Sequence, residues 1–135
     1  MRCERDLGEG GGERFSLRAR LGSGLHAARG LRQLVRREHN AWVHVAATVL
    51  VVLTGAALRV SASDWRGLIL AMALVWLCEA FNTSIERLCD RLHPSHDAAI
   101  GEVKDLAAGG VLVAAIAAAL IGLLTFLPRL LERLS

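Results

Sequence analysis

Residues 68–90, LILAMALVWLCEAFNTSIERLCD, begin as an unbroken apolar run and end in a series of polar and acidic side chains. The apolar run extends from Gly67 to Ile85, about the length of a helix that crosses the ~30 Å hydrocarbon core of a membrane. Glu79 and Asn82 lie within it, where a carboxylate costs at least ~2.5 kcal/mol on insertion scales. The stretch therefore predicts a membrane-spanning helix that carries a functional polar face.

Two further apolar runs lie on either side of this one, and each is long enough to cross a membrane as a helix. Hydrophobic residues make up 53% of the 135-residue chain, and the mean hydropathy of +0.40 is high for a soluble protein. A chain of this length favours one domain. We predict an all-α membrane protein with three transmembrane helices, at 42–60, 67–89 and 105–127.

The segment before the first span has a different pattern. Apolar residues recur every three or four positions from Leu17 to Val35, with arginines around them, as in amphipathic helices that lie on a membrane surface. We predict such a helix over 14–41, interrupted by a break or hinge at its glycines. Residues 1–13 are polar and Gly-rich, so we expect a disordered tail rather than a signal peptide, followed by one domain over 14–135.

The basic residues are distributed unevenly between the two sides of the predicted bundle. Twelve of the sixteen Arg and Lys residues lie before Trp42 or between the second and third spans, and four lie on the other side. Positive charge marks the cytoplasmic side of a bacterial inner-membrane protein, so the N-terminus and the second connection are expected in the cytoplasm. The net charge of +3 suits anionic lipid headgroups and requires no nucleic acid as a partner.

Four polar side chains of the second span fall on one face of a helix. At about 100° per residue they form a narrow stripe that runs ~16 Å from the hydrocarbon toward the cytoplasm: Glu79, Asn82, Glu86 and Asp90. A polar seam that joins helices would account for Asn82, but it explains a row of mutually repelling carboxylates poorly. Carboxylates at this spacing suit a hard cation such as Mg²⁺, which often bridges phosphates, or a general base for a hydroxyl.

Two charged residues outside the stripe are candidates to act with it. Lys104 is the single lysine of the chain beside fifteen arginines, and its compact ammonium group is a suitable phosphate ligand. Glu38 lies at the same predicted cytoplasmic boundary and could complete a metal site with Glu86. The alternatives are chance placement of Lys104 and simple ion pairing of Glu38 with nearby arginines.

The familiar nucleotide-binding loops do not occur in the sequence. It has no G-x-x-x-x-G-K-[ST] loop and no kinase Gly-rich loop, so an ATP site would have to be assembled from helix ends. The polar stripe favours a lipid kinase, in which a membrane alcohol meets a soluble phosphate donor. Two alternatives of other classes are a proton- or cation-conducting module and a non-catalytic scaffold. The scaffold would rely on the small residues of the third span, Gly110, Ala114, Ala118 and Gly122.

Three stretches resemble the prokaryotic integral-membrane diacylglycerol kinase and undecaprenol kinase family. EAFNTSIERLCD (79–90) resembles the signature E-x-x-N-[TS]-x-[IL]-E-x-x-x-D. VKDLAAGGVLVAA (103–115) is similar to A-K-D-x-A-[AG]-[AG]-x-V-L. EHNAWVH (38–44) is similar to an E-x-N-x-x-x-H stretch found especially in the undecaprenol kinase branch. The resemblance covers about residues 15–127.

The resemblance implies a fold, a reaction and a set of residue roles. The fold is a surface helix and three spans that assemble as a homotrimer, with active sites between subunits at the cytoplasmic face. The reaction is phosphoryl transfer from Mg·ATP to the hydroxyl of a membrane lipid. Glu79 is implied as the base near that hydroxyl, and Glu38 and Glu86 as ligands of Mg²⁺. The residues implied at the phosphates are Asn82, Asp90, Lys104 and Asp105. The resemblance also implies an arginine of the amphipathic helix there; Arg18, Arg20 and Arg29 are the candidates, and Arg20 is preferred.

Two lipids fit the resemblance. The EHNAWVH stretch favours undecaprenol, whereas the Arg-rich composition and the loop HPSHD (93–97) are closer to diacylglycerol kinases. We give more weight to the composition and the loop, so diacylglycerol is the preferred substrate and undecaprenol the alternative. Ser95, His96 and Asp97 stand where family members often have an aromatic–His pair, so the resemblance does not say which residues contact the nucleotide base.

Overall fold

The computed structural model describes residues 17–95 and 97–134. They form four helices: α1 (Leu17–Arg37), α2 (His39–Ala57), α3 (Ala62–Leu92) and α4 (Ala98–Leu134). Within these residues there is no β-strand, and α2, α3 and α4 are each long and apolar enough to cross a membrane. The predicted all-α membrane fold with three spans is therefore confirmed. The predicted tail at 1–13 lies outside the described residues.

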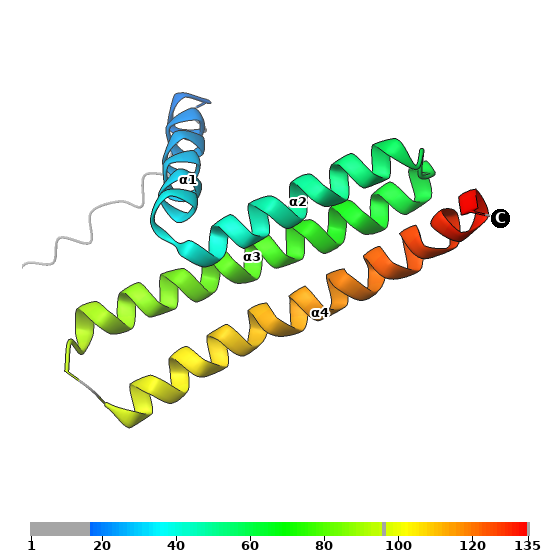
Figure 1. Ribbon diagram of the computed structural model, residues 1–135. Coiled ribbons are helices and arrows are strands. Elements are labelled where there is room, and N and C mark those ends of the chain that lie inside the picture. Colours follow the sequence, from blue (N-terminus) through cyan, green and yellow to red (C-terminus); the bar gives the residue numbers. More distant parts are fainter. Residues whose placement is uncertain (1–16, 96, 135) are drawn as a thin grey trace, which may run out of the picture.

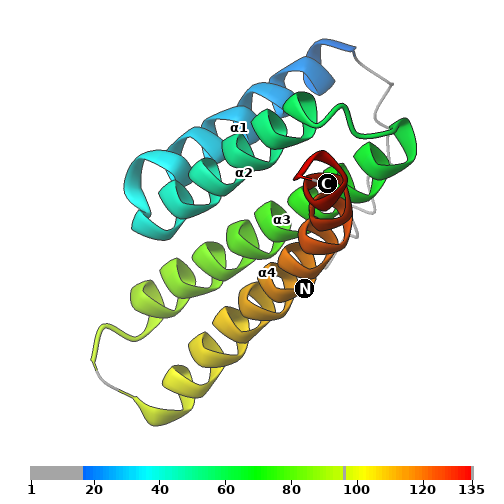
Figure 2. The ribbon, with the colours of Figure 1, turned by 45° about the vertical axis from the view of Figure 1, so that its right-hand side comes forward.

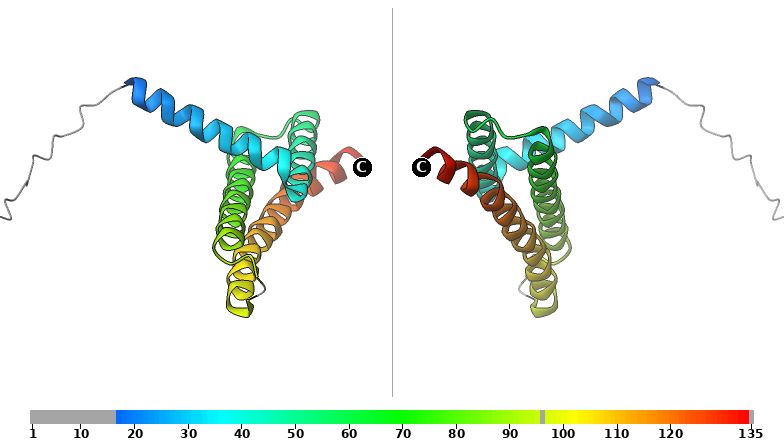
Figure 3. Two further views of the ribbon diagram at one scale, coloured as in Figure 1. Left: turned by 90° about the vertical axis from the view of Figure 1, so that its left-hand side faces the viewer. Right: turned by 90° about the vertical axis from the view of Figure 1, so that its right-hand side faces the viewer.

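The three spanning helices run side by side, and α1 leaves the bundle at a steep angle from the start of α2 (Figure 1). α3 packs most extensively against α4, and α1 projects away from the bundle (Figure 3). The C-terminal end of α4 lies at the same end of the bundle as the connection between α2 and α3, and the α3–α4 connection lies at the opposite end (Figure 2). These are called below the α2–α3 end (residues 57–65 and 125–133) and the α3–α4 end (residues 86–104).

A single extended residue separates α1 from α2. Glu38 has φ −101° and ψ 124°, and the chain changes direction there (Figure 1). The helix predicted over 14–41 therefore ends at Arg37, and the first span begins at His39 rather than at residue 42. At its other end α2 stops at Ala57, because Arg59 takes a left-handed conformation (φ 50°) that a right-handed helix does not continue.

The break predicted at the glycines of the first helix is wrong. α1 is continuous through Gly22, Gly24 and Gly30. A glycine costs ~1 kcal/mol relative to alanine in a helix, which weakens a helix without ending it. No atom lies within 4 Å of the position of a Cβ at any of the three, so close packing does not explain their presence. The contacts of α1 lie toward its C-terminal end, where Leu34 is buried.

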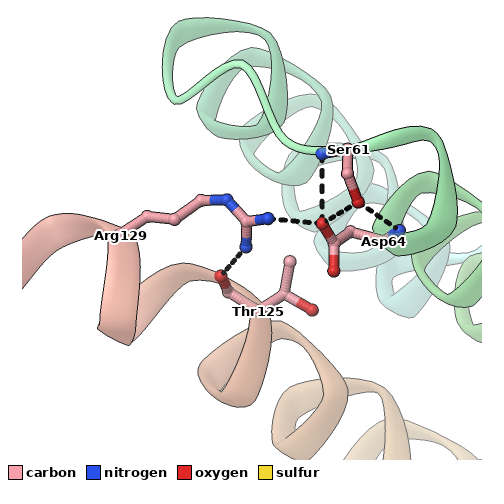
Figure 4. Close-up of polar contacts among 4 residues, drawn as sticks. All are labelled: Ser61, Asp64, Thr125 and Arg129. Atoms are coloured by element: carbon pink, nitrogen blue, oxygen red, sulfur yellow. Dashed lines mark hydrogen bonds and ion pairs between the residues drawn. The ribbon is translucent and has the colours of Figure 1, made fainter.

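The α2–α3 end is held by a cluster of hydrogen bonds and one ion pair (Figure 4). The Ser61 hydroxyl accepts from the Asp64 backbone N–H, and the Asp64 carboxylate accepts from the Ser61 backbone N–H, which together form a capping box. The guanidinium of Arg129 on α4 pairs with the same carboxylate and donates to the Thr125 carbonyl (2.8 Å). The cap starts α3 at Ala62, five residues before the apolar pattern predicts.

α4 also begins earlier than predicted, at Ala98 rather than at residue 105. One carboxylate oxygen of Asp97 accepts hydrogen bonds from the backbone N–H groups of Ala99 (2.9 Å) and Ile100 (3.1 Å). Such a cap satisfies N–H groups that a helix start leaves without partners. The helix then runs for 37 residues and continues through Pro128, so both long helices extend beyond the hydrocarbon at their polar ends.

The surface of the bundle is apolar over most of its length. Leu70, Leu106 and Leu124 are among the large apolar side chains that stay exposed, each more than 70%. The buried side chains are comparatively small, and the ring of Trp65 on α3 lies against Gly55 on α2. Exposed apolar surface of this extent is expected where lipid or another subunit replaces water.

Candidate active site

The polar stripe of α3 continues the face by which α3 packs. Leu68, Ala71 and Val75 are buried at intervals of three and four residues, and Glu79 and Asn82 follow at the same intervals and are also buried. The helix therefore turns these polar side chains toward the protein and not toward lipid. This orientation avoids the cost of exposing a carboxylate or an amide to hydrocarbon.

Glu79 is the most deeply placed carboxylate of the stripe. Its side chain is 3% exposed, and its Oε2 lies 3.6 Å from Nε2 of His44 on α2. The His44 ring meets Trp76 edge-on, with 6.1 Å between the ring centroids, and the Trp76 indole N–H donates to Thr48 Oγ1 (3.1 Å). A protonated imidazole at this distance would offset part of the ~2.5 kcal/mol or more that a carboxylate costs within a membrane.

Asn82 and Glu86 form the middle of the stripe. The Asn82 Nδ2 donates to Glu86 Oε1, one turn further along α3, at 3.2 Å. The Asn82 Oδ1 is buried and has no hydrogen-bond partner among the described residues. A buried polar atom without a partner costs ~1–3 kcal/mol, so a ligand or a water from outside the chain is expected to satisfy it.

Asp90 and Lys104 connect the last turn of the stripe to α4. The Lys104 Nζ lies 2.8 Å from Asp90 Oδ1, across the connection at 93–97. The Asp90 side chain is 66% exposed, and an ion pair in water contributes little to stability. The pair is therefore easy to separate, which leaves the ammonium group available to an anionic ligand.

Glu38 lies at the corner between α1 and α2 and contacts α3. Its Oε1 accepts a hydrogen bond from Nη2 of Arg87 at 2.7 Å, in a pair that is partly exposed. The contact places Glu38 beside the turn of α3 that carries Glu86, the residue that precedes Arg87. The alternative role considered for Glu38, an ion pair with an arginine, is thus present, although the arginine lies on α3 and not beside it in the sequence.

The remaining predicted residues are less informative. Asp105 lies on an exposed position of α4 and pairs with no described residue. Arg20 lies in the first turn of α1, and its side chain is outside the part of the chain that the structure describes. Among the described residues, no three His, Cys, Asp or Glu side chains gather closely enough to hold a metal by themselves.

Two polar cavities open at the α3–α4 end. One has a volume of about 430 Å³ and is lined by Arg37, Arg87, Asp90 and Arg91. The other, of about 310 Å³, lies between the end of α3 and the start of α4 and includes Asp90 and Lys104. Both adjoin Asp90, and together they present three arginines and a lysine at the polar end of the stripe. The first cavity, with three arginines and one aspartate, is basic and suits a phosphate-bearing ligand.

A third cavity lies within the apolar part of the bundle. It has a volume of about 480 Å³ and is bounded by residues of α2, α3 and α4. Its lining is almost entirely apolar, with His44 among the few polar residues, and small residues of α4 such as Ala118 and Gly122 form one wall. Of the four small residues noted on the third span, Ala118 and Gly122 line this cavity and Ala114 is buried.

Reasoning from the sequence missed two residues that the structure places at the stripe. His44 lies inside the first apolar run, and an ionisable residue at that depth is by itself an indication of function. Arg87 follows Glu86 directly, but only the fold shows that it reaches Glu38. The arginines of the basic cavity come from α1 and α3, and no sequence pattern relates them.

Fold and site together define a three-span helical membrane protein whose acidic and basic groups meet at one end of an apolar bundle. Residues 25–126 match the family described as prokaryotic diacylglycerol kinase. The chain is also 36% identical over 106 residues to an undecaprenol kinase of Bacillus subtilis (strain 168), an alignment that covers 78% of this chain and 86% of the relative. The chain belongs to the prokaryotic diacylglycerol kinase family and is a membrane-embedded lipid kinase.

Proposed function

We propose that the protein transfers the γ-phosphoryl group of ATP to the hydroxyl of diacylglycerol, at the cytoplasmic face of the bacterial inner membrane. The observation that carries this proposal is the stripe on α3. It leads from a buried carboxylate at membrane depth, Glu79, to an exposed acid–base pair, Asp90 and Lys104, beside a basic cavity that Asp90 helps to line. Such a gradient suits a reaction between a lipid alcohol and a soluble nucleotide.

In the proposed reaction Glu79 is the general base. As the lipid oxygen forms its bond to the γ-phosphorus, the bond from that phosphorus to the oxygen bridging to the β-phosphate breaks, and ADP leaves with the electron pair. The hydroxyl proton passes to the Glu79 carboxylate. The buried position of this side chain keeps water away from the proton-accepting oxygen, so that a lipid hydroxyl is favoured over hydrolysis.

The donor set fits a hard divalent cation, for which we propose Mg²⁺. Glu38 and Glu86 would hold it, and both offer the oxygen ligands that Mg²⁺ prefers. The absence of a three-residue cluster among the described residues agrees with this role, because Mg²⁺ in kinases is commonly held by one or two carboxylates and by the phosphates of the nucleotide. The unpartnered Asn82 Oδ1 beside Glu86 is a further oxygen for the cation or its water. When bound, the cation neutralises charge on the β- and γ-phosphates.

The phosphates of ATP are assigned to the α3–α4 end. Lys104 would exchange its weak contact with Asp90 for phosphate oxygens, and Asp90 and Asn82 would support the arrangement of phosphate and metal. Asp105 and Arg20 keep the supporting roles that the family resemblance implies. We infer that α1, the N-terminus and the 93–97 connection face the cytoplasm, where ATP is available, because the basic residues gather on that side.

Undecaprenol is the second candidate for the lipid. The family description favours diacylglycerol, whereas the B. subtilis relative is an undecaprenol kinase. Both lipids present one hydroxyl at the membrane surface, so the chemistry at Glu79 is the same for either. We further propose that the chain works as a homotrimer with its sites between subunits, as the family resemblance implies; the exposed apolar surface of the bundle leaves room for such contacts.

The test is a competition assay with purified protein in mixed micelles. Diacylglycerol and undecaprenol are supplied together with γ-labelled ATP and Mg²⁺, and the labelled lipids are separated. Labelled phosphatidic acid in excess supports the first proposal, and labelled undecaprenyl phosphate supports the second. Ion flux in liposomes without ATP, combined with no labelled lipid, would instead favour a conducting module. The oligomeric state is measured separately by native mass spectrometry, in which a monomer or dimer would contradict the trimer.

A further inference from the structure

His44 is an ionisable residue at membrane depth that the proposed reaction does not yet use. Its side chain is 14% exposed and lies on the first turns of α2. Its Nε2 lies 3.6 Å from Oε2 of Glu79, and no other described side chain forms an ion pair with that carboxylate. Burial makes the contact selective, because neither group has water as a ready alternative partner.

The imidazole ring is itself held in place by α3. Trp76 packs against it at an interplanar angle of 65°, in the edge-on arrangement that aromatic rings favour. The Trp76 ring is fixed in turn by its hydrogen bond to Thr48, one turn beyond His44 on α2. The ring of His44 thus packs against a residue that is itself anchored to α2, which restrains the imidazole whose Nε2 lies 3.6 Å from the Glu79 carboxylate.

The apolar cavity adds an independent observation. Among the described residues that line it, His44 is the titratable one, and Glu79 is not part of the lining. The imidazole therefore borders the cavity and also lies within 3.6 Å of the Glu79 carboxylate.

We propose that His44 is the positioning residue of the general base: it holds Oε2 of Glu79 and so presents the other carboxylate oxygen to the lipid hydroxyl. The inference rests on the proposed role of Glu79. The proton still goes from the hydroxyl to Glu79, and His44 neither donates nor accepts a proton in the reaction. Its contribution is orientation, because a base must lie within hydrogen-bond reach of the proton that it accepts.

The first test examines the contact without any activity. In protein labelled with ¹⁵N-histidine, the ring resonances of His44 are assigned by their loss in His44→Leu. Glu79→Gln should shift these resonances at constant pH, whereas Glu86→Gln, which alters a carboxylate of the same helix two turns away, should leave them in place. Unchanged resonances in Glu79→Gln would overturn the proposal.

The second test separates positioning from folding and from nucleotide binding. His44→Leu should lower kcat with either lipid about 10- to 100-fold, since misplacement of a reacting group costs about that much, and should leave the KM for ATP within about twofold. His44→Gln keeps an N–H donor and should restore most of kcat. Thr54→Val is the matched control on α2, because Thr54 lines the same cavity and does not contact Glu79.

The outcomes distinguish this inference from the proposed function. An active enzyme whose His44→Leu variant keeps its kcat, or whose His44→Gln variant loses as much as His44→Leu, contradicts the positioning role alone. A wild-type protein that phosphorylates neither lipid contradicts the proposed function. The role of His44 in positioning the base is then contradicted as well, because it depends on that reaction. A changed thermal midpoint in His44→Leu that His44→Gln and Thr54→Val do not share would assign His44 to the structure of the bundle instead.

Discussion

α3 and α4 are joined at both ends by one acidic and one basic side chain, and the two pairs differ. At the α2–α3 end, Asp64 pairs with Arg129, and the side chains are 26% and 29% exposed. At the α3–α4 end, Asp90 pairs with Lys104, and Asp90 is 66% exposed. Both pairs join an aspartate of α3 to a basic residue of α4, so the difference lies in what surrounds each pair.

At the α2–α3 end, both members of the pair also form hydrogen bonds within the fold. Asp64 also caps α3 through Ser61, and Arg129 also donates to the Thr125 carbonyl (Figure 4). Lys104 and Asp90 have no such further partners among the described residues, and cavities adjoin them. The comparison indicates that the first pair stabilises the bundle and that the second is free to exchange partners, as a ligand-binding group must be.

The largest effect is expected for Glu79→Gln. The change keeps the size of the side chain and removes the proton acceptor, so kcat for lipid phosphorylation should fall about a thousandfold. Stability in detergent should be unchanged or increased, because the variant no longer buries a charge. The measurements are initial rates with labelled ATP and thermal unfolding followed by circular dichroism. Turnover near that of the wild type would remove Glu79 as the base.

Lys104→Met breaks the exchangeable pair. Loss of a charged donor to the phosphates should lower kcat/KM for ATP about a hundredfold, while the thermal midpoint stays close to that of the wild type. Lys104→Arg is the matched control for charge. It should recover only part of the activity, because the planar guanidinium does not replace a compact ammonium group. A lowered midpoint with normal kinetics would place Lys104 with the structural pair.

The position of the polar stripe could be predicted from the sequence because two requirements coincide. Glu79 and Asn82 cannot face lipid, and the helical period alone places them on the face of Leu68 and Val75. The three spans follow from the length of the apolar runs, and the family resemblance follows from the spacing of the stripe and of Lys104 with Asp105. These features depend only on the spacing of residues that lie close together in the sequence.

Other features depend on contacts between segments that are distant in the sequence, and no local sequence pattern predicts these contacts. The pairing of Glu38 with Arg87 requires the corner between α1 and α2 at Glu38, whereas the apolar pattern placed the start of the first span at residue 42. The contact of His44 with Glu79 requires the relative rotation of α2 and α3. The starts of α3 and α4 were predicted too late in the chain, because Ser61 and Asp97 cap the helices several residues before the apolar runs begin.

Arg129→Met breaks the structural pair and is the counterpart of Lys104→Met. It removes the partner of Asp64 and the donor to the Thr125 carbonyl, so the thermal midpoint should fall by a few degrees, roughly the effect of one charged contact. The kinetic constants for ATP and lipid should stay within about twofold, since the site lies at the opposite end of α3. Loss of kcat at a temperature where the variant is fully folded would show that the two ends are coupled.

Gly55→Ala is the most conservative change at the α2–α3 end and should have the smallest effect. A Cβ at this position would lie 2.8 Å from the Trp65 ring, closer than side chains pack, so the indole must shift. Overpacking costs ~1–3 kcal/mol, and replacing a helical glycine by alanine returns up to ~1 kcal/mol, which leaves a net loss of stability of about 1 kcal/mol.

The free energy of unfolding in mixed micelles measures this loss. Gly109→Ala is the control, because no atom of another segment lies within 4 Å of a Cβ there. If Gly55→Ala were as stable as Gly109→Ala, the contact of Trp65 with α2 would not contribute to holding this end, and the contrast between the ends would rest on the Asp64–Arg129 pair alone.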